Sequence, residues 1–258
     1  MARQVRQALL YLLVPAGLYA ALCVLMFFTQ RSQIYFPVPE SVVPGATPML
    51  FAGDGARIKV WTVERPGPAA LLYFGGNAED VGASIGVFAR RLPDHSLFFV
   101  NYRGYGGSTS EPSERALVAD AIGLYDRLHA RYPEVSVIGR SLGSAVAVQL
   151  AAARRLERLA LVTPFDSLVN VARAHFPWFP VGLLMLDRYD SASRASAITA
   201  ETQVVIAEAD EIVPRASSDS LVDAFRIPPR VVVLESARHN DLDLDPRYLD
   251  EVVTFLGR

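Results

Sequence analysis

The sequence predicts an α/β fold in which a mostly parallel, doubly wound sheet has helices on both faces. Short apolar runs alternate with longer stretches of helical periodicity from residue 57 to the C-terminus. The later runs are almost continuously hydrophobic, as expected of parallel strands that are buried on both faces. A chain of 258 residues is long enough to form one such domain with a substantial core.

Strands and helices are expected to alternate along the chain. The expected strands are residues 57–63, 70–74, 96–102, 135–139, 159–163, 203–208 and 230–235. Helical spacing of apolar residues predicts helices over 81–92, 117–128, 141–155 and 246–258. A Pro-rich stretch leads into the first strand, and the longest interruption of the pattern covers residues 164–202. No internal repeat or second globular domain is visible.

The N-terminus predicts one transmembrane helix. Residues 8–29 carry no charge, and 22 residues at about 1.5 Å each span a hydrocarbon core of roughly 30 Å. This run is longer than the apolar region of a cleaved signal peptide, and bulky Leu22 before Cys23 argues against a lipoprotein. We therefore expect a single-pass, uncleaved signal-anchor at 1–30. Arg3 and Arg6 before it favour a cytoplasmic N-terminus, with the remaining domain on the non-cytoplasmic side.

Composition excludes several classes of function. The net charge is −2, and the absence of a basic stripe argues against nucleic acid as a partner. With Cys23 as the single cysteine, internal disulfides and cysteine-based zinc sites are excluded. The Gly-rich "RGYGGST" lacks the third glycine of a dinucleotide-binding loop. We expect no cofactor and no metal, whereas the oligomeric state is not indicated.

A serine between two glycines marks the candidate nucleophile. The pattern G-x-S-x-G covers Gly139, Ser141 and Gly143, where an expected strand passes directly into an expected helix. Small residues at its two ends let strand and helix approach around a strained turn that projects the Ser141 hydroxyl. The N–H group of Leu142 then lies at the helix N-terminus, where it can bind an oxyanion.

A serine nucleophile needs a base, and the order of the chain selects His239. The sequence has four histidines: His95, His129, His175 and His239. The first two precede Ser141, and His175 precedes the candidate acids of the later strands. Only His239 lies in the loop after the last expected strand, where a base can fold back over the edge of the sheet.

The acid and the second oxyanion donor are expected in two other loops. Asp210 begins the loop after the strand that precedes His239, which makes it the predicted acid, with Glu211 as the main rival and Glu208 still inside the strand. The stretch "LLYFGGNAED" ends an early strand in two glycines. We assign the second N–H group to Asn77, with Gly76 as the alternative.

An ordered set of motifs resembles the α/β-hydrolases. The set comprises "YFGGNAED", "NYRGYGGSTSEPSE", "GRSLGSAVA", "TPFDSL", "ADEIVP" and "HNDL". It is similar to the membrane-anchored branch that includes palmitoyl-protein thioesterase-like serine hydrolases, and it covers about residues 35–258. The resemblance implies a triad of Ser141, Asp210 and His239 and a small cap over 164–202. The chain departs from many relatives at Gly75, where they have a histidine.

The sequence therefore predicts a membrane-anchored serine hydrolase of the α/β-hydrolase fold, with its hydrolase domain at 31–258. Ser141 would form an acyl-enzyme during cleavage of an ester or thioester whose acyl group belongs to a small molecule or is lipid-linked. The apolar run "HFPWFPVGLLM" could line an acyl pocket or touch the bilayer. A serine peptidase and a non-catalytic scaffold on the same fold are the alternative hypotheses.

Overall fold

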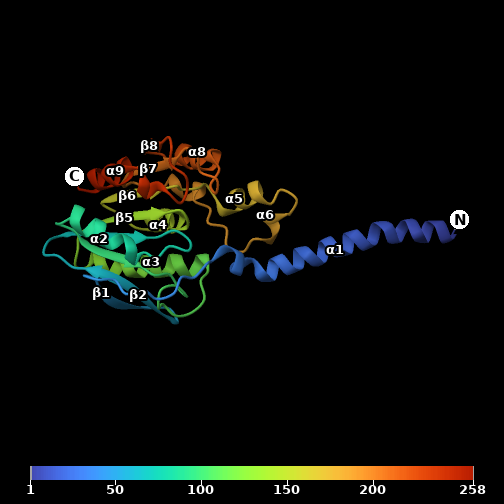
Figure 1. Cartoon of the computed structure of the whole chain (residues 1–258), viewed down its shortest axis with the longest axis horizontal. Helices are drawn as coiled ribbons and strands as arrows, with labels where there is room; N and C mark the ends of the chain where they lie inside the picture. Colours follow the sequence, from blue (N-terminus) through green and yellow to red (C-terminus); the bar gives the residue numbers. More distant parts are fainter. Residues whose placement is uncertain (1, 258) are drawn as a thin grey trace.

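The computed structural model describes residues 2–257, which form one α/β domain with a long helix at its N-terminal end (Figure 1). Helix α1 (Ala2–Ile34) projects away from the domain, and the N-terminus lies far from the sheet. The part of α1 from Tyr11 to Ile34 is 24 residues long, has a mean hydropathy of 2.2 and is not buried by the rest of the chain. By length and composition this part can cross a membrane.

An eight-stranded sheet in the order β1-β2-β4-β3-β5-β6-β7-β8 forms the centre of the domain. β2 is antiparallel to β1 and β4, and all the other neighbours are parallel. The connections reverse direction between β3 and β5, which is the switch point where α/β sheets usually bind ligands. The strands are β1 (Thr47–Gly53), β2 (Ala56–Val63), β3 (Ala69–Phe74), β4 (Ser96–Val100), β5 (Glu134–Arg140), β6 (Arg158–Val162), β7 (Glu201–Ala207) and β8 (Arg230–Leu234).

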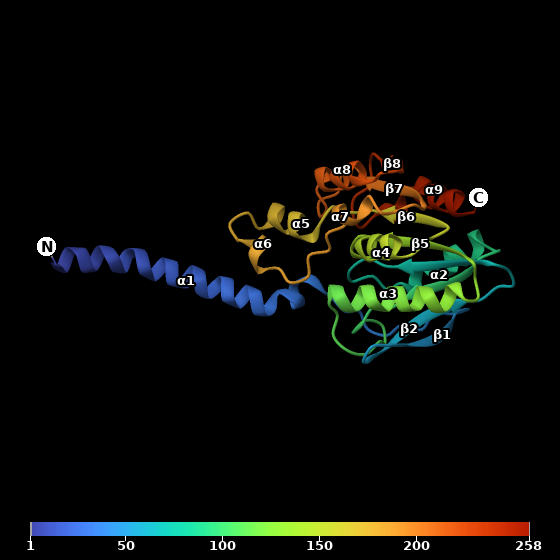
Figure 2. The same cartoon turned by 180° about the vertical axis from the view of Figure 1, so that it is seen from behind.

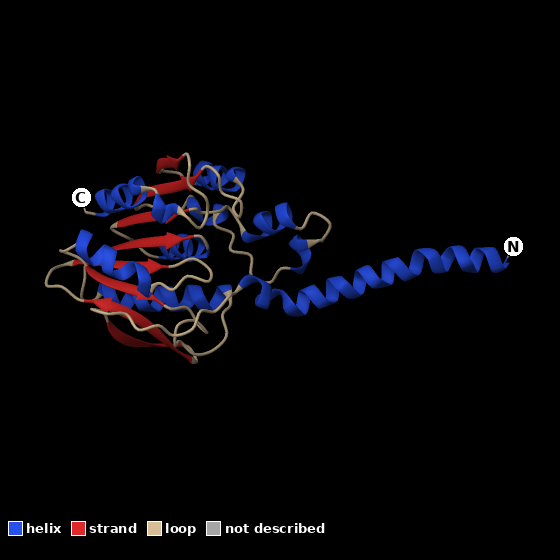
Figure 3. Ribbon diagram, viewed as in Figure 1, coloured by secondary structure: helices blue, strands red, loops and turns tan. Residues whose placement is uncertain are grey.

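Helices cover both faces of the sheet (Figure 3). Adjacent strand residues point to opposite faces, so Leu71 of β3 belongs to one hydrophobic core and Leu72 to the other. One core is closed by α2 (Gly82–Arg91) and α9 (Pro246–Leu256), which follows the short helix η1 (Leu242–Leu244). The opposite core is closed by α3 (Glu114–His129), α4 (Leu142–Ala153) and α8 (Arg215–Ala224).

The connection between β6 and β7 leaves the sheet and lies beside α1 (Figures 1 and 2). We call residues 163–200 the β6–β7 segment. It contains α5 (Leu168–His175), α6 (Val181–Leu184) and α7 (Ala192–Ala195), and α6 contacts α1. The expected interruption of the strand–helix alternation at 164–202 therefore coincides with an excursion toward the N-terminal helix.

The fold confirms the predicted class and each expected strand, with ends that shift by up to two residues. One correction concerns Glu208, which follows β7 instead of belonging to it. Strand β1 was not expected, because Pro48 and a Pro-rich neighbourhood hide a short edge strand that pairs only with β2. Helix α8 was also not expected, since its three serines lower the helical signal.

A buried ion pair beside the sheet leads to a prediction on stability. Arg103 donates from Nε and Nη2 to both carboxylate oxygens of Asp120, over 2.7 and 2.8 Å, and the two side chains are only 10% and 7% exposed. Asp120→Ala leaves a buried guanidinium without a partner, so we expect the free energy of unfolding to fall by about 3–5 kcal/mol. Urea unfolding in a fixed detergent measures this loss.

The chain contains a matched control for this experiment. Arg154 and Asp126 form the same bidentate pair over 2.6 and 2.9 Å, but their side chains are 39% and 48% exposed. Asp126→Ala should therefore change the free energy of unfolding by no more than about 1 kcal/mol. Equal losses in the two variants would contradict the assignment of the larger effect to burial.

Candidate active site

Ser141 occupies a strained turn at the carboxyl end of β5, one residue before α4. Its backbone angles are φ 50° and ψ −115°, a region that non-glycine residues rarely adopt. The Ser141 N–H group donates to the carbonyl of Val162 over 2.9 Å, which fixes the turn against β6. A strained strand-to-helix turn of this kind projects the serine hydroxyl from the edge of the sheet.

The two flanking glycines are required by close packing around this turn. A Cβ atom on Gly139 would lie 2.4 Å from the carbonyl oxygen of Gly143. A Cβ atom on Gly143 would lie 2.1 Å from the carbonyl oxygen of Phe74, at the end of β3. Both distances are impossible for real atoms, so the spacing G-x-S-x-G follows from the approach of α4 to β5 and β3.

The structure brings together the three side chains that the sequence singles out. Ser141 Oγ lies 2.8 Å from His239 Nε2, and His239 Nδ1 lies 2.7 Å from Asp210 Oδ2. The side chains of His239 and Asp210 are only 6% and 5% exposed. The imidazole is therefore held by a shielded carboxylate on one side while it faces the serine on the other.

The loop after β7 orients Asp210 through its backbone. Asp210 Oδ1 accepts hydrogen bonds from the N–H groups of Ile212 and Val213, over 2.8 and 2.7 Å, which leaves Oδ2 directed at His239. The rival acids lie elsewhere. Glu211 is exposed, and Glu208 forms an ion pair with Arg215 of α8.

Backbone amides from two segments, the start of α4 and the residues after β3, lie near the Ser141 hydroxyl. The N–H group of Leu142 belongs to the first turn of α4, whose leading amides have no partner within the helix. Gly76, at the end of β3, lies next to the turn, because a Cβ on it would be 3.6 Å from Ser141 Cβ. Its own N–H group already donates to Glu79 Oε2 over 2.6 Å. Among residues 2–257, the N–H group of the following Asn77 donates to no other group.

The side chain of Asn77 fixes the loop after β3, which is the candidate oxyanion loop, to the end of α1. Its Oδ1 accepts from the Phe36 N–H group over 3.0 Å and from the Tyr105 hydroxyl over 2.7 Å. Its Nδ2 donates to the carbonyl of Ile34. Burial raises the pKa of Tyr105 to about 12, so its hydroxyl remains a donor at neutral pH. The candidate oxyanion loop is thus connected directly to the N-terminal helix.

A buried polar cluster behind the loop was not identified from the sequence. Glu79 accepts from the Tyr73 hydroxyl over 2.6 Å as well as from Gly76, and Arg140 Nη1 lies 3.8 Å from its Oε2. Burial raises the pKa of Tyr73 well above its usual value and keeps it a donor. Arg140 precedes Ser141 and also donates to the carbonyl of His239 over 3.5 Å. The cluster therefore links the loop, the serine turn and the histidine loop.

The Ser141 turn separates two pockets of different character. One, of about 260 Å³, is lined mostly by apolar side chains from α1, the β6–β7 segment and the loop after Asp210. The other, of about 490 Å³, is bordered by Glu79, Arg140, His239 and Asp243. A group bound at Ser141 thus has an apolar neighbourhood on one side and a polar one on the other.

His175, which the order of residues in the chain argues against as the base, lies at the apolar pocket and does not contact the serine. Its Nε2–H donates to the carbonyl of Ile212 over 2.8 Å. Within the described part of the chain, no three His, Cys, Asp or Glu side chains are grouped to hold a metal ion.

Sequence relatives extend over most of the chain. An uncharacterized protein of Mycobacterium tuberculosis is 39% identical over 255 residues, covering 90% of each chain. Alpha/beta hydrolase domain-containing protein 17B of Xenopus laevis is 30% identical over 198 residues, which cover 73% of this chain and 66% of the relative. The human protein of the same name is 29% identical over the same shares. No family model matches the sequence.

Solved structures agree at the level of the fold. An enol-lactonase from Burkholderia xenovorans covers 81% of this chain and 100% of its own, with a TM-score of 0.65 and 19% identity. The Pyrococcus furiosus esterase Pf2001 covers 86% of this chain and 97% of its own, with a TM-score of 0.70 and 15% identity. The sheet order, the strained serine turn and these relatives together place the chain in the α/β-hydrolase family.

Proposed function

We propose that the protein is a membrane-anchored serine hydrolase that cleaves carboxylic esters or thioesters through an acyl-enzyme. The observation that carries the proposal is the hydrogen-bonded chain of Ser141, His239 and Asp210 at a strained strand-to-helix turn. The hydrolase and esterase names of the relatives and structural neighbours support the reaction class.

His239 acts first as a base and then as an acid. Its Nε2 accepts the proton of Ser141 Oγ as the oxygen attacks the substrate carbonyl, and Asp210 stabilises the resulting imidazolium at Nδ1. The imidazolium then protonates the departing alcohol or thiol, which leaves an acyl group on Ser141. Water, activated by the same Nε2, attacks this ester and restores the free serine.

The oxyanion of each tetrahedral intermediate is bound by the N–H groups of Leu142 and Asn77. The Leu142 amide adds the positive end of the α4 dipole, since it lies in the first turn of that helix. Gly76, the alternative donor, is unsuitable because its N–H group is occupied by Glu79. This occupation favours Asn77 as the second donor.

The two pockets bind different parts of the substrate. The apolar pocket accepts the acyl chain, since Phe165, Leu168 and Val171 of the β6–β7 segment and Met26 of α1 line it. The polar pocket faces the leaving group.

We assign the β6–β7 segment as the small cap and the apolar part of α1 as an uncleaved anchor. Arg3 and Arg6 before the apolar stretch favour a hydrolase domain on the non-cytoplasmic side.

Labelling with a fluorophosphonate probe tests the proposed nucleophile. The probe phosphonylates serine hydroxyls that an adjacent base activates, so the wild-type chain should be labelled and Ser141→Ala should not. Ser144→Ala is a matched control, because the Ser144 hydroxyl donates to the carbonyl of Ser141 over 2.6 Å without contacting His239. Unchanged labelling of Ser141→Ala would assign the reaction to another nucleophile, and a wild-type chain that is not labelled at all would favour a scaffold.

A second test concerns Glu79 as a positioning residue for the oxyanion loop. In Glu79→Gln one acceptor oxygen becomes an amide nitrogen, so the side chain no longer accepts from both Gly76 and Tyr73. A displaced Asn77 amide should lower kcat by about 10–100-fold while KM changes less. Steady-state kinetics on a p-nitrophenyl ester measures the split.

Asp80→Asn provides the control for this variant. Asp80 accepts from the Ser41 hydroxyl and the Gly82 N–H group, away from the Ser141 turn. The Asp80→Asn variant should lower the melting temperature but leave kcat nearly unchanged. An equal loss of kcat in the two variants would assign Glu79 a merely structural role.

A further inference from the structure

An uncharged, exposed loop lies beside the N-terminal helix. Residues 176–186, which we call the apolar loop, carry no charged side chain and include α6. Trp178 and Leu183 are 85% and 87% exposed, and Phe176 and Leu186 are about half exposed. Large apolar side chains gathered on one surface mark an interaction site.

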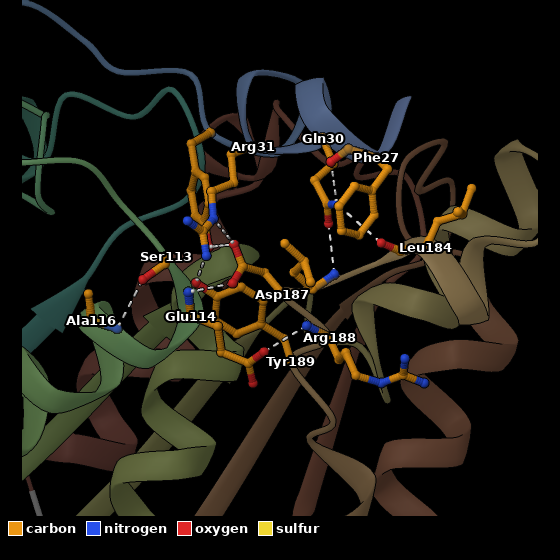
Figure 4. Close-up of polar contacts among 12 residues, drawn as sticks. Phe27, Gln30, Arg31, Ser113, Glu114, Ala116, Leu184, Asp187, Arg188 and Tyr189 are labelled. Carbon is orange, nitrogen blue, oxygen red and sulfur yellow. Dashed lines mark hydrogen bonds and ion pairs between the residues drawn. The ribbon is translucent and has the colours of Figure 1, made fainter. Parts of the chain in front are cut away.

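The uncharged stretches of α1 and of the apolar loop are each followed by a charged residue, and these two residues form one ion pair (Figure 4). No charge occurs in α1 between Arg6 and Arg31, and Asp187 is the first charge after the apolar loop. Arg31 Nε donates to Asp187 Oδ2 over 3.0 Å, and Asp187 also accepts from the Tyr35 hydroxyl over 3.1 Å. Burial raises the pKa of Tyr35, which stays protonated as a donor. This ion pair marks a common boundary between charged and uncharged surface.

Polar side chains of α1 satisfy backbone groups of the apolar loop. The Tyr19 hydroxyl donates to the carbonyl of Trp178 over 2.8 Å. Gln30 Nε2 donates to the carbonyl of Leu184 over 3.1 Å, and Gln30 Oε1 accepts from the Leu186 N–H group over 2.7 Å (Figure 4). Irregular backbone persists inside a bilayer only where protein groups replace water as its partners. Tyr19 and Gln30 are such partners, and both side chains are uncharged.

The contact at Tyr19 determines how far the loop follows α1. Tyr19 is twelve residues from Arg31, which is about 18 Å along a helix. Half of a hydrocarbon core is about 15 Å. If Tyr11–Ile34 crosses a bilayer, the tip of the apolar loop at Trp178 therefore reaches about the middle of the hydrocarbon core.

We propose that the apolar loop is inserted in one leaflet together with α1, so that the apolar pocket at Ser141 takes its acyl chain laterally from that leaflet. Met26, Gln30, Gln33 and Ile34 of α1 form one wall of this pocket, and Phe176 and Met185 of the apolar loop border it. The anchor thus contributes to binding as well as to localisation. The insertion rests on the proposed anchoring of α1, and the lateral entry rests on the proposed hydrolase function.

Tryptophan fluorescence tests the insertion without using activity. The chain has two tryptophans, exposed Trp178 and Trp61, which is buried in the sheet. The difference in emission between the wild type and Trp178→Phe reports on Trp178 alone. In phosphatidylcholine vesicles, we expect lipids brominated midway along their chains at least to halve this emission, and iodide in the water to leave it unchanged. Quenching by iodide but not by brominated lipid would overturn the proposal, and would instead leave the loop as a surface for a soluble partner.

A pair of variants tests lateral entry. Leu183→Glu places a charge on the exposed tip of the loop, outside the pocket lining, so hydrolysis of a long-chain acyl ester embedded in vesicles should fall about tenfold or more. Hydrolysis of water-soluble p-nitrophenyl butyrate should stay within about twofold of the wild-type rate, since no group at Ser141 is altered. Leu50→Glu, on the distant edge strand β1, is the matched control and should leave both rates unchanged.

The outcomes separate this inference from the proposed function. An unchanged rate of Leu183→Glu on the embedded ester overturns lateral entry while the hydrolase assignment stands. A wild-type chain that cleaves neither ester and ignores the fluorophosphonate probe overturns the hydrolase assignment and lateral entry with it. The fluorescence result still decides the insertion in that case.

Discussion

Alanine at Ser141 or at His239 is expected to lower kcat/KM for a p-nitrophenyl ester at least about ten-thousand-fold. Without the hydroxyl no acyl-enzyme forms, and without the imidazole the proton has no acceptor 2.8 Å from Oγ. Because the two side chains act as one unit, the double variant should lose no more activity than either single variant. Steady-state kinetics on the three purified variants measures this non-additivity.

His175→Ala is the matched control for His239→Ala. His175 also lies at the apolar pocket, but its Nε2 contacts the carbonyl of Ile212 instead of the serine. Its loss should change kcat/KM less than about tenfold, since no proton transfer depends on it. Strictly additive losses at Ser141 and His239, or an equal loss at His175, would contradict the proposed pairing.

Asp210→Asn is expected to lower kcat by about 10³–10⁴-fold with little change in stability. Oδ1 of this side chain accepts from the N–H groups of Ile212 and Val213, so an asparagine would keep its oxygen there and direct its amide nitrogen at His239. The amide donates to Nδ1 and thereby leaves the proton on Nε2, the tautomer that cannot accept the serine proton. Kinetics and thermal unfolding of the same preparation test both halves of the statement.

Glu211→Gln and Glu208→Gln complete this experiment. Both carboxylates lie within two residues of Asp210, but Glu211 is exposed and Glu208 pairs with Arg215. Neither change should lower kcat by more than about twofold, since neither carboxylate contacts His239. A large loss at Glu211 with a small one at Asp210 would move the role of the acid to the neighbouring residue.

The sequence predicts most of what the parallel core requires. Buried strands need unbroken apolar runs, and the serine turn needs glycines at 139 and 143, so both leave strong local patterns. His239 and Asp210 could be selected because the chain has few histidines and the loops after parallel strands meet at one edge. What remains a prediction is their catalytic role.

Features that depend on long-range packing could not be derived in this way. Glu79 and Arg140 are ordinary charged residues in the sequence, and their cluster exists only because the loop after β3 lies beside the end of β5. The same holds for the pocket wall supplied by α1. Gln30 and Tyr19 show no signal in a hydropathy pattern, yet they bond to residues more than 150 positions away.

The position of α1 connects the proposed anchor to the site. Asn77, whose N–H group we assign to the oxyanion, bonds through its side chain to the carbonyl of Ile34 and the amide of Phe36. The last turn of the helix therefore supports both the proposed acyl pocket and the proposed oxyanion loop. Removal of residues 1–34 should consequently impair catalysis on soluble esters as well as membrane binding.

The most direct test of the central claim is the trapping of the acyl group on Ser141. The wild-type chain is mixed with p-nitrophenyl butyrate, quenched in acid within the first turnover, digested and analysed by mass spectrometry. The proposed mechanism predicts a butyryl group on the Ser141 hydroxyl, formed together with a burst of p-nitrophenol and absent from Ser141→Ala. Turnover without an acylated peptide, or with the acyl group on another residue, would contradict it.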